Sequence, residues 1–138
     1  MDHYLFLSSQ SSKEQHPNNT STDFTVELPK TYYLEGTWEV ALKELETRIN
    51  EDLFYVLSDV CQESSVGGTL TSVLRSVRRE KKKDVLFTFT DPYYITVRPD
   101  QLPRVRIYLR GRDLQSVKMD SSVLYCTLHL RKKDVQST

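Results

Sequence analysis

The stretch VRIYLRG, residues 105–111, decides the fold class of this chain of 138 residues. Val, Ile and Leu alternate in it with Arg and Tyr, which is the period of a β-strand with one buried and one exposed face. FTVEL at residues 24–28 and LYCTLHL at residues 124–130 repeat the alternation, and further short runs lie between Pro, Gly and polar residues. Because no long helical segment separates these runs, we expect an all-β fold: an antiparallel β-sandwich, single jelly-roll-like, with about eight or nine short strands.

Two segments allow a second interpretation. In residues 38–49 alternate residues are apolar, as in a strand, but Trp38, Leu42 and Leu45 also fall at helical spacing. Residues 69–77 are likewise compatible with a strand or with one short helix. The aromatic and β-branched start of the first segment favours a strand that bulges or ends near Glu44.

The alternation also assigns the core. In the strand expected after residue 52, Leu53, Tyr55 and Leu57 share one face, and Pro29 is expected to end the strand that begins at Phe24. We expect the core to contain Phe24, Val26, Leu28, Trp38, Val40, Leu42, Phe87, Phe89, Ile95, Val97, Ile107, Leu109, Leu124, Cys126 and Leu128.

Length and composition indicate one domain over residues 1–138, with a polar loop or arm at residues 8–23. The formal net charge is zero, which gives no long-range attraction to nucleic acid or to an anionic membrane and makes self-association easier. The first apolar run is too short for a signal peptide, and no window approaches the length of a membrane span. We therefore expect no membrane partner.

The sequence offers no pattern typical of catalysis. Cys61 and Cys126 are expected to be free thiols in a reducing compartment, because neither has a second cysteine or a His pair at ligand spacing. Cys126 and His129 point to opposite faces of one expected strand, so they cannot form a nucleophile–base pair, and the imidazole is expected to be exposed. We expect no enzyme activity, no cofactor and no metal site.

Basic side chains form three clusters, at residues 75–83, 104–112 and 131–133. Gathered on one surface, they would neutralise several phosphates, so a small nucleic-acid-binding β-domain is the alternative function. Charged hairpins and edge strands that deter aggregation explain the same residues. The residues of the patch are Arg75, Arg78, Arg79, Lys81, Lys82, Lys83, Arg106 and Arg110.

Two features are candidates for an oligomer interface. The polar arm contains Asn18, Asn19 and Thr20, and its composition leaves it nothing to bury within its own subunit. Tyr32 and Tyr33 are adjacent aromatics of the kind enriched in interfaces, although ordinary packing at the rim of the domain accounts for them equally well.

Four motifs occur in order along the first third of the chain: LSSQSS at residues 7–12, PNNT at 17–20, DFTVELP at 23–29 and LEGTWEVALKEL at 34–45. This opening resembles that of a family of virion-type proteins encoded by Polinton (Maverick) elements and the related adintoviruses and adomaviruses. In the matching positions Gly36 permits a turn and Trp38 anchors the core.

The resemblance implies a structural virion protein, a penton-like minor capsid subunit with a jelly-roll fold in a non-enveloped double-stranded DNA virus or Polinton-like element. Its partners would be copies of itself, with a pentamer favoured, and other capsid proteins. Its location would be the virion, after synthesis in the host cytoplasm and assembly in the host nucleus. A fibre-head or receptor-binding sandwich is a weaker alternative.

Overall fold

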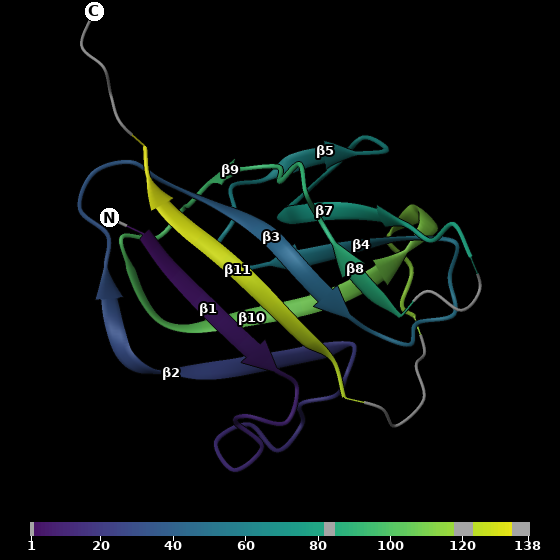
Figure 1. The fold of residues 1–138 in the computed structure, drawn as a ribbon, viewed down its shortest axis with the longest axis horizontal. Helices are drawn as coiled ribbons and strands as arrows, with labels where there is room; N and C mark the ends of the chain where they lie inside the picture. Colours follow the sequence, from purple (N-terminus) through teal and green to yellow (C-terminus); the bar gives the residue numbers. More distant parts are fainter. Residues whose placement is uncertain (1, 82–84, 118–122, 134–138) are drawn as a thin grey trace, which may run out of the picture.

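The computed structural model describes residues 2–81, 85–117 and 123–133, and these form two facing antiparallel sheets (Figure 1). The sheet called here the front sheet has the order β1-β11-β3-β8, with β9 pairing β3 beside β8. Its strands are β1 (Asp2–Ser8), β11 (Tyr125–Lys132), β3 (Trp38–Glu46), β8 (Leu86–Thr88) and β9 (Ile95–Thr96). The back sheet has the order β2-β10-β4-β7. Its strands are β2 (Asp23–Tyr33), β10 (Gln101–Gly111), β4 (Leu53–Ser58) and β7 (Val73–Arg78).

The connections make this sandwich a jelly roll. The first four strands alternate between the front and back sheets, and so do the last four units, β7, β8 with β9, β10 and β11. The resulting strand orders are those of two interleaved Greek keys. The expected antiparallel β-sandwich is therefore confirmed.

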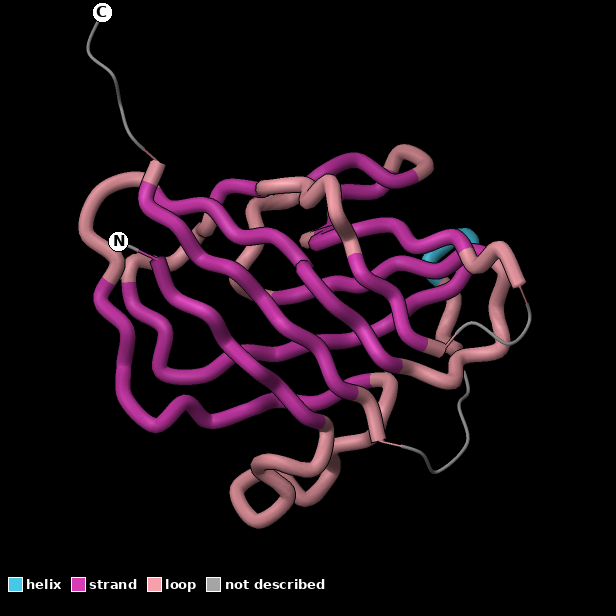
Figure 2. The backbone as a smooth tube through the Cα atoms, in the orientation of Figure 1, coloured by secondary structure: helices cyan, strands magenta, loops and turns pink. Residues whose placement is uncertain are grey.

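The described residues contain more strands than the eight or nine expected, for two local reasons. β8 and β9 pair successive parts of β3, so they are one interrupted edge strand. A small hairpin, β5 (Ser64–Val66) and β6 (Thr69–Thr71), is inserted between β4 and β7. Figure 2 shows that the rest of the described backbone is loop, apart from the single 3₁₀ turn η1 (Arg112–Leu114). Within the described residues, no helix is long and apolar enough to cross a membrane.

Both ambiguous segments are strands. In β3 the register against β11 shifts between the pairs Thr127–Glu44 and Leu128–Leu42, so Lys43 is an extra, bulged residue. The bulge lets Leu42 and Leu45 both point into the core, although they are an odd number of residues apart. The apparent helical spacing thus comes from a strand with one additional residue. Residues 69–77 divide between β6 and β7.

The core fills the space between the two sheets, and most of its expected members are there. Leu28, Phe87, Phe89 and Ile95 are only partly buried, packed against its margin, while the other expected residues are buried. In β4 the expected phase is wrong, because Phe54 and Val56 are fully buried while Leu53 and Tyr55 are half-exposed; Leu57 is buried as well.

Pro29 does not end its strand. β2 continues to Tyr33, and it tolerates the proline because it is an edge strand whose register against β10 is irregular between Arg104 and Leu102.

The two cysteines are free, buried and far apart in the sheet pairings. Cys126 lies opposite Leu45 on β11, whereas Cys61 follows β4 and bridges to Val97, whose backbone bonds to Trp38 at the other end of β3. Burial raises the pKa of each thiol to about 12, and the Asp59 carboxylate adds to the effect at Cys61.

We expect both cysteines to be inert in the folded protein. A raised thiol pKa leaves almost no thiolate at pH 8, and the thiolate is the reactive form. A disulfide reagent such as dithionitrobenzoate should label neither thiol in native buffer and both in denaturant. Rapid labelling of either cysteine without unfolding would contradict the burial of that side chain.

Candidate assembly face

The outer face of the front sheet carries four large exposed side chains. Phe6 is 77% exposed, Leu86 61%, Tyr4 52% and Tyr125 50%. They lie there because strand residues alternate: in β1, for example, Leu5 and Leu7 point into the core while Tyr4 and Phe6 point out. We call these four residues the assembly face.

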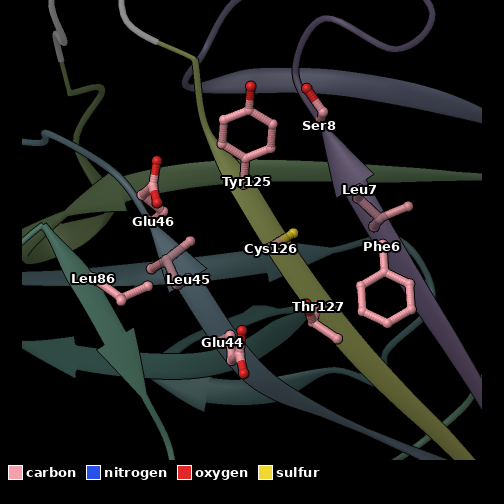
Figure 3. A pocket seen from close by; sticks show the side chains of 10 residues that line it. All are labelled: Phe6, Leu7, Ser8, Glu44, Leu45, Glu46, Leu86, Tyr125, Cys126 and Thr127. Carbon is pink, nitrogen blue, oxygen red and sulfur yellow. The ribbon is translucent and has the colours of Figure 1, made fainter.

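A groove of about 360 Å³ crosses this face at one end (Figure 3). Phe6 of β1, Tyr125 of β11 and Leu86 of β8 contribute its apolar surface. Glu44 and Glu46 of β3 add two exposed carboxylates to the same groove. The groove is therefore apolar with an acidic margin.

His129 anchors the other end of the assembly face. Its ring stacks on Tyr4 with centroids 4.5 Å apart, and its Nδ1 lies 2.6 Å from the Tyr94 hydroxyl. Asp2 places a carboxylate oxygen 3.2 Å from the other ring nitrogen, at ion-pair distance but without hydrogen-bond alignment. The expectation of an exposed imidazole is wrong, since His129 is 7% exposed under these neighbours. Its placement on the face opposite Cys126 is confirmed, because His129 stacks on the outward-pointing Tyr4 whereas Cys126 belongs to the core between the sheets.

β2 is an edge strand of the back sheet, and one hydrogen bond shows which of its backbone groups point away from the sheet. The backbone N–H of Leu109 in β10 donates to the carbonyl of Thr22 at 2.8 Å. Because backbone groups alternate in direction along a strand, Thr25 and Glu27 direct theirs away from β10. Left bare, these groups would be a template for another strand.

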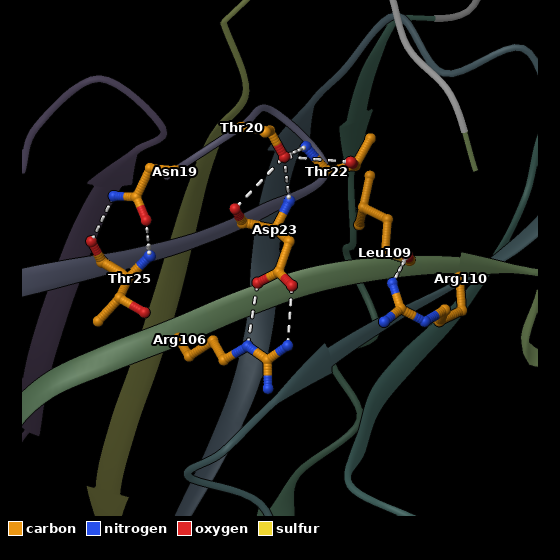
Figure 4. Close-up of polar contacts among 8 residues, drawn as sticks. All are labelled: Asn19, Thr20, Thr22, Asp23, Thr25, Arg106, Leu109 and Arg110. Carbon is orange, nitrogen blue, oxygen red and sulfur yellow. Dashed lines mark hydrogen bonds and ion pairs between the residues drawn. The ribbon is translucent and has the colours of Figure 1, made fainter. Parts of the chain in front are cut away.

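The loop of residues 9–22 caps that edge with side chains. The Asn19 amide accepts a bond from the Thr25 N–H at 2.9 Å and donates one to the Thr25 carbonyl at 2.8 Å (Figure 4). The hydroxyl of Ser12 accepts a bond from the Glu27 N–H at 2.9 Å. Asn19 and Ser12 are both buried, so a polar loop is fixed to its own subunit by hydrogen bonds to backbone.

The premise that this arm has no partner in its own subunit is therefore wrong. Asn19 uses its amide on β2, and Thr20 closes the turn before the strand by accepting bonds from the N–H groups of Thr22 and Asp23. Asn18 is exposed. Contact of Asn18 or Thr20 with a second copy stays a prediction.

The two candidate tyrosines differ. Tyr32 is partly buried, with its ring edge-on to His3 at 4.8 Å and under the Lys30 ammonium at 5.0 Å. Tyr33 is 72% exposed at the end of β2, so it alone of the pair has its surface available.

Most arginines of the second basic cluster have acidic or aromatic neighbours. Arg106 makes two parallel bonds, of 2.9 and 2.8 Å, to the carboxylate of Asp23 (Figure 4), and this pairing raises the pKa of Arg106. The guanidinium groups of Arg106 and Arg110 lie 4.2 and 5.1 Å from the centre of the Tyr108 ring between them. Arg104 pairs with Glu27 at 2.9 Å.

The first basic cluster does not form one uniform patch. Arg75 packs over Phe89 at 4.0 Å, and Arg79 donates to the carbonyl of Ile49 at 2.8 Å with only 6% of its side chain exposed. Arg78 and Lys81 are exposed. Lys82 and Lys83 lie outside the described residues. In the third cluster, Arg131 pairs with Glu39 at 2.6 Å.

The described residues contain no group of three or more His, Cys, Asp or Glu side chains that could hold a metal ion. Sequence reasoning missed the assembly face itself. The signal was present in the aromatic residues at the outward positions of β1 and β11, where a solvent-facing strand normally carries polar side chains.

No family model matches this chain, and no characterised protein matches it by sequence. Among solved structures it is similar to the core of Drosophila NLP, a protein described in terms of pentamer formation and histone binding. The two share 10% identity with a TM-score of 0.39, over 97% of this chain and 100% of that one. A likeness at this level carries no argument about function.

We expect Asn19→Ala to destabilise the fold by about 1–3 kcal/mol, because it leaves the backbone groups of Thr25 without partners. Asn18→Ala is the matched control, since the neighbouring exposed side chain should change stability by less than about 0.5 kcal/mol. Urea unfolding of both variants measures the difference. Equal stabilities would show that the loop does not cap β2.

Proposed function

We propose that this chain is a structural subunit that assembles with copies of itself, as a penton-like minor capsid protein of a non-enveloped double-stranded DNA virus or Polinton-like element. One observation carries the assembly part of the proposal: four large exposed side chains share one outer face of a jelly roll. The capsid part, and the preference for five copies, rest on the resemblance of residues 7–45.

The chemistry of the face suits an interface. Tyr and Phe are enriched where proteins meet, because flat rings bury much area and lose little conformational freedom. Exposed apolar side chains that gather on one face mark interaction sites more reliably than scattered ones do. The formal net charge of zero leaves no overall repulsion between copies.

A closed ring contains a fixed number of subunits. If the groove of one subunit receives a different surface of the next, the contact is heterologous, and such contacts either close into a ring or continue as a filament. A vertex protein requires the ring.

Replacing Leu86 and Tyr125 with Ser should separate the subunits without unfolding them, since both side chains lie on the surface. The matched control replaces Leu70 and Tyr93, which are of the same types, 69% and 65% exposed, and outside the face. Native mass spectrometry and light scattering at tens of micromolar should give pentamers, single or joined in pairs, for the unmodified chain and the control, and no ring, only monomers or dimers, for the variant.

A chain that stays monomeric under these conditions would contradict self-assembly. Dimers or trimers that dissociate in the face variant would keep assembly and remove the penton assignment. Equal effects of the two double variants would show that the face is not the contact.

A further inference from the structure

Among the residues that the structure describes, none pairs with the outer edge of β1, and two hydrogen bonds show which of its backbone groups point outward. Ser9, directly after β1, donates its N–H to the carbonyl of Leu124 at 3.0 Å, so odd-numbered residues of β1 face β11. On the other side of β11, the Lys133 N–H donates to the Thr37 carbonyl at 2.8 Å, so odd-numbered residues of β11 bond to β3 and even-numbered ones bond to β1. The even-numbered residues of β11 lie opposite odd-numbered residues of β1, which gives the same orientation of β1 independently. Tyr4 and Phe6 therefore direct their N–H and C=O groups away from the sheet.

The other three edges of the sandwich are each protected. Side chains of the loop at residues 9–22 cap β2, as described above. The β8–β9 edge is short and interrupted, with Asp91-Pro92 in the gap. β7 has an irregular register against β4, and Arg75 reaches from it to the carbonyl of Asp91 at 3.3 Å. Broken strands, bulges, proline and basic side chains are the usual defences against edge pairing.

β1 has none of these defences. Its sequence, DHYLFLS, contains no Pro, Lys or Arg. Its seven residues pair with β11 in unbroken register from Asp2–Arg131 to Ser8–Tyr125, so the strand is regular along its whole length. A long, regular edge with exposed aromatic side chains is a surface that a further strand can join.

We propose that β1 pairs antiparallel with β1 of a second copy, so that the two front sheets become one continuous sheet. This inference rests on the proposed self-assembly and adds a second contact to it: a two-fold pairing cannot join neighbours within a ring of five, so it joins subunits of two different rings. In the register centred on Leu5, Tyr4 of each copy lies opposite Phe6 of the other, and their free backbone groups exchange four hydrogen bonds across the two-fold axis.

This register also suits the side chains. Tyr4 and Phe6 of the two copies lie side by side on the outer face, extending the stack of Tyr4 on His129 into a row of rings that crosses the junction. Asp2 lies opposite Ser8 of the second copy, so the two carboxylates do not face each other. The same strand on both sides makes the edge self-complementary, which favours a second copy over an unrelated peptide.

Amide hydrogen exchange tests the pairing in the unmodified protein. In the assembled state the N–H groups of Tyr4 and Phe6 should exchange at least about tenfold more slowly than on dilution to monomer. Those of Leu5 and Leu7 should change much less, because they are already bonded to β11. Assembled protein in which the Tyr4 and Phe6 amides exchange as in the monomer would overturn the pairing and leave the proposed function standing.

A pair of variants separates backbone from side chain. Phe6→Ala keeps the free N–H and Phe6→Pro removes it, without breaking a bond to β11. Two hydrogen bonds are lost per dimer, so the dissociation constant of Phe6→Pro should exceed that of Phe6→Ala by on the order of 30-fold. Equal constants for two folded variants would also overturn the pairing. If the unmodified chain forms only dimers, and these are lost in Phe6→Pro but persist in the Leu86→Ser, Tyr125→Ser double variant, the pairing is supported and the ring is contradicted.

Discussion

A β-sandwich depends on what satisfies the backbone groups along the edges of its two sheets. Inside a sheet the N–H and C=O groups of neighbouring strands pair with each other, but an edge strand directs half of its own groups outward. Here the side chains of Asn19 and Ser12 bond to the backbone of the β2 edge. The β8–β9 edge is interrupted, and the β7 edge has an irregular register and carries Arg75. The remaining edge strand, β1, contains Phe6, the most exposed aromatic residue of the described chain. The edge whose backbone N–H and C=O groups point outward without a strand partner therefore lies beside the surface whose apolar side chains are exposed.

The polar loop shows how composition can mislead. A segment rich in Ser, Asn and Thr cannot contribute to an apolar core, yet it can imitate a strand, because an amide side chain carries the same donor and acceptor as a peptide group. Asn19 does this for Thr25 with two hydrogen bonds of ordinary length. The loop is therefore part of the back sheet's hydrogen bonding, although it contributes no strand there.

Alternation predicted the sandwich because it identifies the inward face directly, as with Ile107 and Leu109 in β10. It could not settle β4, where apolar residues occupy both faces and only the neighbouring strands decide that Phe54 points inward. For β3 the pattern indicated a bulge or a strand end near Glu44 but could not decide between them, because the bulge at Lys43 depends on the register of the partner strand. The assembly face was missed because residues 4–7 of β1 are all apolar, so alternation there does not show which of them face solvent, and Tyr125 in β11 was the only clear signal. The capping role of Asn19 was equally invisible, since it joins a loop to a strand edge that only the fold creates.

The pairing of β1 with β11 joins Asp2 to Arg131, so the front sheet is completed by the first and the last of the described strands. On the ribosome β1 is made before any other described strand, and its partner emerges after all the rest. Until then β1 has two unpaired edges and no sheet to hold its leucines, and contacts of such long sequence separation form slowly. A nascent chain of this design is most vulnerable to wrong strand pairing in the interval before β11 is synthesised, when neighbouring chains on one message carry the same exposed segment.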